Sequence, residues 1–258
     1  MAKEKSAIER FAESKFMRKL QEGSQKLASN EIFSTISGGM GATMGLIMVG
    51  AVIQIVCAVG AMFGWDTSSA SYQAFYMPYK LTMGLMGFFM CFSMAYNYAK
   101  RKKMNQMQSV VTALVCYILV VSPPVSASVV AADGTIGRAF DALNLSSLGT
   151  GGMFVAIIVG LCSVAISKFV IDHNWTIKLP DVVPEGIAHS FNAIIPMSVN
   201  IIVWYGISLI ISAVSGGALT LSSLITLILS VPVNFLTSTP GMFVVIALAQ
   251  LCWFCLLY

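Results

Sequence analysis

Residues 39–63 read GMGATMGLIMVGAVIQIVCAVGAMF, a run of apolar and small residues in which Gln54 is the one strongly polar side chain. A helix needs about 20 apolar residues to cross the hydrocarbon core of a bilayer, so this run is long enough to span a membrane. The whole chain agrees with it, because 57% of its 258 residues are hydrophobic and 10% are charged, whereas soluble domains carry about 25% charged residues. The sequence therefore predicts an integral membrane protein.

The segment before this span is charged and amphipathic. Lysines, arginines and glutamates alternate along residues 1–30, while Ile8, Phe11, Phe16 and Leu20 recur at helical spacing. This pattern is typical of a helix that lies on a membrane surface with its apolar face toward the lipid. It differs from a signal peptide, in which a short basic segment is followed at once by an apolar core and a small-residue cleavage site. We therefore expect an amphipathic surface helix at residues 1–30.

Further apolar runs follow along the chain, separated by polar residues or prolines. They predict membrane segments near residues 81–99, 107–121, 148–171 and 193–214. Beyond residue 215 the pattern weakens, because the run 219–230 is short and Pro232, Asn234 and Pro240 interrupt the chain before residues 241–258. The sequence thus predicts an all-α, polytopic membrane protein with six or seven membrane segments.

Basic residues indicate which ends of the spans face the cytoplasm. The cluster at residues 100–103 reads KRKK and directly follows the second predicted span. Lysine and arginine are enriched in cytoplasmic loops, so this cluster and the N-terminus, two crossings earlier, are expected inside. Of the 15 lysines and arginines, all but Lys80 and Arg138 then face the cytoplasm. Residues 65–79 and the segment after the third span are the expected external loops.

Residues 175–196, WTIKLPDVVPEGIAHSFNAIIP, form the most polar stretch within the apolar part of the chain. Three prolines, Pro180, Pro184 and Pro196, prevent one continuous helix. In a membrane protein such broken, polar backbone is tolerated at the surface or where it lines a cavity. The residues alone leave both placements open.

Several classes of function have no support in the residue pattern. The sequence has no nucleophile-elbow arrangement of Ser, His and Asp, no motif of paired histidines and no glycine-rich phosphate loop. The six cysteines stand singly in apolar runs, which is typical of small buried residues. The net charge of +4 gathers at predicted membrane edges and forms no patch suited to nucleic acid. We therefore expect a protein that is not an enzyme and that binds no metal, cofactor or nucleic acid.

Short motifs along nearly the whole chain share their order and spacing with one family of membrane proteins. They are AYNYAK at residues 95–100, GTGGMFVAI at 149–157, IKLP at 177–180, VP at 183–184, SF at 190–191, IP at 195–196 and the apolar run at 241–254. With these motifs the chain resembles enzyme IIC, the membrane permease subunit of bacterial phosphoenolpyruvate-dependent sugar phosphotransferase systems, in the lactose, cellobiose and diacetylchitobiose branch.

The resemblance implies a homodimeric permease in the lipid bilayer of the bacterial cell membrane, with a cytoplasmic N-terminus. Such a permease binds a β-linked disaccharide and delivers it inside, where a IIB component with a phosphorylated cysteine modifies the sugar. Phosphoryl transfer would then belong to the cytoplasmic IIB and IIA components, and this chain would supply transport.

The polar stretch holds the candidate sugar-binding residues, which are Glu185, His189, Ser190 and Asn192. They offer hydrogen-bond donors and acceptors within two helical turns, and Glu185 and His189, four apart, share one face of a helix. Sugar hydroxyls are recognised by such groups in an otherwise apolar cavity. Two other interpretations stand beside this one. The stretch is a connector with solvated charges at the inner surface, or His189, where relatives often carry Lys or Arg, faces the membrane boundary or a phosphate.

The C-terminal end departs from the family pattern. The family continues after residues 253–254 with Phe-Gly-Ile-His-Gly, whereas CLLY follows here. By the resemblance, residues 1–30 are the surface helix, 31–215 are the dimerisation and scaffold half, and 216–258 begin the substrate-binding half without completing it. A second function therefore stays open, namely a truncated, non-transporting pseudo-permease or a dimerisation partner of a full-length permease.

Overall fold

The structure is a computed structural model that describes residues 19, 22, 23, 25, 26, 28–130, 136–175, 191–217 and 219–257. Most of the expected surface helix at residues 1–30 lies outside the described residues, as do the candidate site residues Glu185, His189 and Ser190. The described chain is helical apart from one hairpin, which confirms the predicted all-α class. It divides into two compact units, Thr35–Thr226 and Met1–Ser34 with Leu227–Tyr258.

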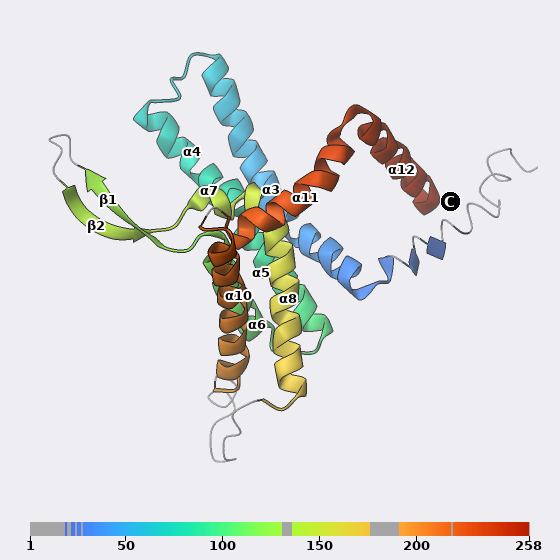
Figure 1. The fold of residues 1–258 in the computed structure, drawn as a ribbon. Coiled ribbons are helices and arrows are strands. Elements are labelled where there is room, and N and C mark those ends of the chain that lie inside the picture. The colour runs from blue at the N-terminus through green and yellow to red at the C-terminus, as the bar shows by residue number, and fades with distance from the viewer. Residues whose placement is uncertain are drawn as a thin grey trace, which may run out of the picture. The chain divides into compact units, whose positions relative to one another are not determined.

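Figure 1 shows the described helices and strands in chain order. The helices are α3 (Glu31–Met62), α4 (Ala70–Thr82), α5 (Met86–Arg101), α6 (Gln106–Val121), α7 (Leu145–Leu148), α8 (Met153–Asp172), α10 (Ile194–Val214), α11 (Leu221–Thr237) and α12 (Thr239–Leu257). Two 3-10 turns, η1 (Met83–Leu85) and η2 (Thr150–Gly152), precede α5 and α8, and the strands are β1 (Val125–Val130) and β2 (Ile136–Ala142).

Long apolar helices account for several of the predicted spans. In the described part of the chain, Glu31–Met62, Thr150–Asp172 and Ile194–Val214 are long and apolar enough to cross a membrane, and Gln106–Val121 and Leu221–Ser230 are shorter apolar helices. The predicted third and fifth spans begin within one residue of α6 and α10. The first helix begins earlier than predicted, at Glu31. This set of helices is that of a polytopic membrane protein.

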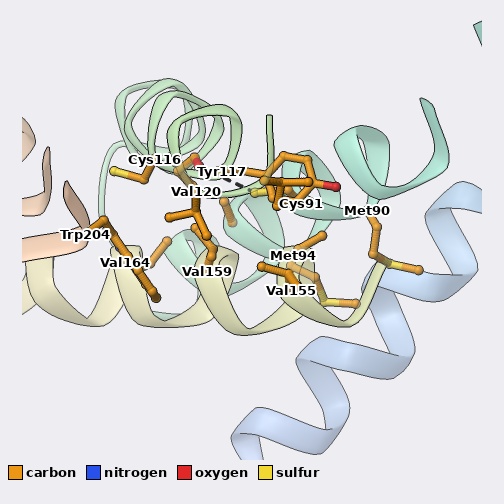
Figure 2. Packing of buried hydrophobic residues seen from close by; sticks show 14 of the residues in the cluster. Met90, Cys91, Met94, Cys116, Tyr117, Val120, Val155, Val159, Val164 and Trp204 are labelled. Atoms are coloured by element: carbon orange, nitrogen blue, oxygen red, sulfur yellow. Dashed lines mark hydrogen bonds between the residues drawn. The ribbon is translucent and has the colours of Figure 1, made fainter. Parts of the chain in front are cut away.

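Helices α5, α6, α8 and α10 pack against one another and hold the core of the unit Thr35–Thr226. Their buried residues recur every three or four positions, so one face of each helix points inward. Figure 2 shows the core residues of α5 and α6 lying against Val155, Val159 and Val164 of α8. Trp204 joins this core from α10. The bundle therefore holds the ends of these four helices in fixed positions.

Close backbone approach sets the distance between α5 and the turn that precedes α8. A Cβ atom on Gly87 would lie 2.7 Å from the carbonyl oxygen of Leu148 and 2.8 Å from that of Gly149. The hydroxyl of Tyr117 lies in the same place and shares its single hydrogen between the carbonyl oxygens of Leu148 and Gly152, both at 3.4 Å. Glycine is therefore required at position 87, because any side chain there would push the two segments apart.

The segment at residues 65–79, expected outside the membrane, is partly helical. Asp66 accepts hydrogen bonds from the backbone N–H of Ser68 at 2.9 Å and from its hydroxyl at 2.8 Å. These bonds, the backbone one first, hold the pKa of Asp66 below its ordinary value. Ser69 then caps α4 by accepting a backbone N–H, and the helix begins at Ala70. The turn is therefore short and locally hydrogen-bonded.

The second predicted span, 81–99, is divided by the 3-10 turn η1, which corrects the prediction. At η1 the chain meets the segment before α8, since a Cβ on Gly149 would lie 2.9 Å from the carbonyl oxygen of Gly84. The apolar run in the sequence predicts one continuous helix here. It carries no information about the contact between Gly84 and Gly149, which lies far along the chain.

Helix α6 ends at Val121, as predicted, and the segment that follows it forms a β-hairpin. Strands β1 and β2 pair antiparallel, with Val125 opposite Ala142 and an irregularity between Ser128 and Val130. The predicted interruption before residue 241 is present, but it lies at Ser238 and not at Pro232, because α11 runs without a break to Thr237 and α12 begins at Thr239. One proline removes a single helical hydrogen bond, and apolar helices tolerate it.

Candidate functional site

A polar cavity of about 330 Å³ lies between one set of helix ends in the unit Thr35–Thr226. It is bounded by the turn after α5, the first turns of α6, the last turns of α8 and the start of α10. The lining residues are Lys103, Met104, Asn105, Gln108, Ser109, Thr112, Ser167, Lys168, Ile171, Asn192, Ala193 and Pro196. The cavity therefore joins the three chain regions that the basic residues predict on one side of the membrane.

A tight turn places Lys103 and Asn105 at the cavity. Lys103 has φ 55°, in the left-handed region, and Met104 N–H donates to the carbonyl oxygen of Ala99 at 3.0 Å. This bond closes the end of α5 as a Schellman-type cap. The side chain of Asn105 then caps α6 by accepting the N–H of Gln108 at 3.3 Å. Three residues thus reverse the chain and carry a lysine on the turn.

The end of α8 closes in the same way. Asn174 has φ 57°, and Trp175 N–H donates to the carbonyl oxygen of Val170 at 3.1 Å. One turn earlier, Lys168 forms an ion pair with Asp172. His173 is exposed. The closed helix end leaves Ser167 and Lys168 facing the cavity.

Buried polar side chains continue from the cavity into the bundle. The Nδ2 atom of Asn200 donates to the Ser167 hydroxyl oxygen at 2.9 Å and to the carbonyl oxygen of Pro196 at 2.8 Å. One turn further along α10, Nε1 of Trp204 donates to the hydroxyl oxygen of Ser163 at 2.9 Å. These hydrogen bonds link α10 to α8 through buried side chains, so they fix how the two helices face each other.

The Oδ1 atom of Asn200 is buried and has no hydrogen-bond partner among the described residues. Both hydrogens of its amide are already used by Ser167 and Pro196. A buried acceptor without a donor is unfavourable, and a bound water or ligand hydroxyl is the usual remedy. Asn200 and Ser167 were not among the residues predicted for the site, although an asparagine within the apolar run 193–214 is a recognisable signal.

Of the four candidate residues, the structure locates one. Asn192 is half-buried and lines the cavity together with Lys103 and Ser167. Glu185, His189 and Ser190 lie outside the described residues. Their proposed role is untested, and the position of Asn192 places only the described end of the polar stretch at this cavity.

The charged side chains that line the cavity are basic. Among the described residues its lining has two cations, Lys103 and Lys168, and no carboxylate. Asp172 pairs with Lys168 from outside the lining. The hydroxyls of Ser109 and Thr112 donate to backbone carbonyls of their own helix, both at 2.9 Å. The cavity is therefore polar, basic and built from fixed helix ends.

The family model for "Phosphotransferase system, EIIC" matches residues 32–257. This chain belongs to the EIIC family. Its similarity to curated members extends to the lactose-specific EIICB component of Streptococcus mutans serotype c, 26% identical over 200 residues, which are 74% of this chain and 33% of the relative. The corresponding component of Staphylococcus epidermidis is 28% identical over 199 residues, 74% of this chain and 32% of the relative.

A solved structure shares the fold. The transporter ChbC, the IIC component of the N,N'-diacetylchitobiose-specific phosphotransferase system, matches with a TM-score of 0.70 at 22% identity, over 86% of this chain and 52% of that chain. The EIIC chain thus spans about a third of the length of the curated relatives and about half of the solved transporter. The EIIC resemblance predicted from the sequence motifs is confirmed, and with it a multi-pass protein of the cell membrane.

Proposed function

We propose that this EIIC chain belongs to a permease that carries a β-linked disaccharide across the bacterial cell membrane to a cytoplasmic IIB component. The observation that carries the proposal is the family match over residues 32–257. Its relatives are named for lactose and for N,N'-diacetylchitobiose, and both sugars are β-linked disaccharides. The chain supplies transport, and phosphoryl transfer lies in the IIB and IIA components.

The polar stretch is proposed to form part of the sugar path. Asn192 supports this, because it lies on a polar cavity between helix ends. Glu185, His189 and Ser190 belong to the same stretch and are proposed to act with it. Hydroxyl and amide groups that converge on a cavity suit sugar recognition.

Residues 1–258 alone are proposed not to transport. Alternating access requires one structural unit to close over a sugar held against another. The cavity lining has no carboxylate and no aromatic ring among the described residues. Sugar hydroxyls that find no partner because a second unit does not close over them would each cost about 1 to 3 kcal/mol, which together abolishes useful affinity. A non-transporting pseudo-permease, or a dimerisation partner of a longer permease, is the second candidate.

Calorimetry and uptake test whether residues 1–258 alone bind and transport a sugar. The purified chain is titrated with cellobiose, lactose and diacetylchitobiose, and is reconstituted in vesicles with IIA and IIB components for uptake. We expect no saturable signal from residues 1–258. Saturable uptake that is lost in Glu185→Gln or His189→Ala, and kept in the control Ser230→Ala on α11, would contradict the proposal and make the polar stretch a sufficient binding site.

A homodimer is also proposed. Met44, Met48, Val52 and Ile55 form an exposed apolar face on α3. Beside this face Gly41 and Gly45, four residues apart, have no other group close enough to meet an added Cβ. Small residues at this spacing let membrane helices approach closely. The face therefore suits a second copy of the chain.

A further inference from the structure

We propose that the cavity between the ends of α5, α6, α8 and α10 binds a phosphate group. This inference does not depend on sugar transport. The lining has two lysines and no carboxylate among the described residues. An anion would therefore meet the charge of Lys103 without an opposing acid in the lining, whereas the charge of Lys168 is shared with Asp172. Lys168 forms an ion pair with Asp172, which lies outside the lining. The ammonium group of Lys168 has three hydrogen-bond donors, so it keeps donors for a second partner.

The backbone at Lys103 supports a role for its side chain. Lys103 has φ 55°, a conformation in which the Cβ atom is crowded and for which glycine is the usual residue at a helix end. A lysine held in an unfavourable backbone conformation, on the wall of a cavity, points to a function for the charge. Among the described residues Lys103 has no ion-pair partner that would give it a structural purpose.

The remaining donors of the cavity suit phosphate oxygens. The Ser167 hydroxyl oxygen accepts from Asn200, so its own hydrogen is left to donate. Asn105 uses Oδ1 for the cap of α6, so its Nδ2 group is left to donate. The start of α6 adds the positive end of the helix dipole. Cavity, lysines and neutral donors therefore coincide at one place.

Two sources supply such a phosphate. The cavity lies where helices of the bundle begin and end beside the basic residues 100–103, and a basic pocket between membrane helices suits the phosphate of an anionic lipid headgroup. A soluble phosphate ester offers the same oxygens. About 330 Å³ is within the usual range for a small-ligand pocket, so size admits both.

The test uses the full chain in nanodiscs. For the lipid arm, the discs contain equal amounts of phosphatidylglycerol and phosphatidylcholine, and native mass spectrometry counts the lipids that stay bound. For the soluble arm, discs of phosphatidylcholine alone are titrated with glycerol 3-phosphate and with inorganic phosphate. We expect preferential retention of phosphatidylglycerol or saturable binding of a soluble phosphate, and either result supports the site and identifies its source.

Variants tie the binding to the cavity. The double variant Lys103→Gln with Lys168→Gln should weaken binding at least about tenfold, because two charge-assisted hydrogen bonds are lost. The matched control Lys100→Gln removes an exposed lysine of the same basic cluster that lies outside the lining, and should leave binding unchanged. Lys103→Gly should weaken binding without lowering the melting temperature, since glycine relieves the backbone strain.

Three results would overturn the proposal. They are the absence of phosphate selectivity in both arms, binding that is the same in the double variant, and an equal loss in the Lys100→Gln control. Each shows that the cavity is not the phosphate site, whatever the chain transports.

Discussion

The Nδ2 atom of Asn200 on α10 lies 2.9 Å from the hydroxyl oxygen of Ser167 on α8, and both side chains are buried. This hydrogen bond connects the wall of the polar cavity to the interior of the bundle. Ser167 is the shared residue, since it also lines the cavity. The stability of the α8–α10 pair and the shape of the cavity are therefore coupled through one hydroxyl group.

Ser167→Ala should lower the free energy of unfolding by about 1 kcal/mol, the typical worth of a hydrogen bond between membrane helices. Asn200 keeps its bond to the Pro196 carbonyl, so the loss stays moderate. Unfolding of the purified chain in mixed micelles of increasing denaturing detergent measures the change. The control is Ser230→Ala, which removes a half-buried hydroxyl that bonds within its own helix. Equal effects of the two variants would show that the link between α8 and α10 carries no stability.

Gly87→Ala should destabilise the bundle by about 1 to 3 kcal/mol, the usual range for overpacking. The added methyl group would meet the carbonyl oxygens of Leu148 and Gly149, which are backbone atoms and cannot move aside alone. The matched control is Gly206→Ala in α10, where an added Cβ meets nothing within 4 Å. It should be neutral or slightly stabilising, because alanine favours helix more than glycine does. A thermal melt of each variant decides the point, and equal melting temperatures would contradict the packing described at Gly87.

Labelling of single cysteines in a cysteine-free background should show which segments lie outside the membrane and which lie inside. Ser68→Cys, in the turn between α3 and α4, should react with an impermeant maleimide added outside intact cells. Lys100→Cys and Asn174→Cys should react only after the cells are opened, because the basic residues near both positions favour the cytoplasm. Labelling of Lys100→Cys from outside would reverse the predicted topology, including the cytoplasmic N-terminus.

Gly45→Leu should weaken the proposed homodimer, because it adds a large side chain beside the exposed face of α3 where close approach is needed. A Met44→Cys variant should form a disulfide-linked dimer in oxidised native membranes, and the added Gly45→Leu change should reduce its yield. Gly206→Leu serves as the control, since Gly206 also has open space around it but lies on α10. A chain that stays monomeric in lipid and in several mild detergents would exclude the dimer.

The sequence alone determined the membrane class, the helical fold and most of the span positions. The third and fifth spans were predicted closely, at α6 and α10, because the length of an apolar run depends only on neighbouring residues and on the thickness of the bilayer. The order of short motifs likewise identified the EIIC family, which the family match over residues 32–257 confirms.

Tertiary structure decided what depends on contacts between distant segments. The division of the second span at η1 follows from the approach of Gly149 to Gly84, 65 positions apart in the printed sequence. The pairing of Asn200 with Ser167 joins residues 33 positions apart. Lys103 became a candidate because the turn after α5 holds it at φ 55° on the wall of a cavity. Hydrophobic periodicity records which face of a helix avoids water, whereas partners, close approaches and cavities exist only after the helices pack.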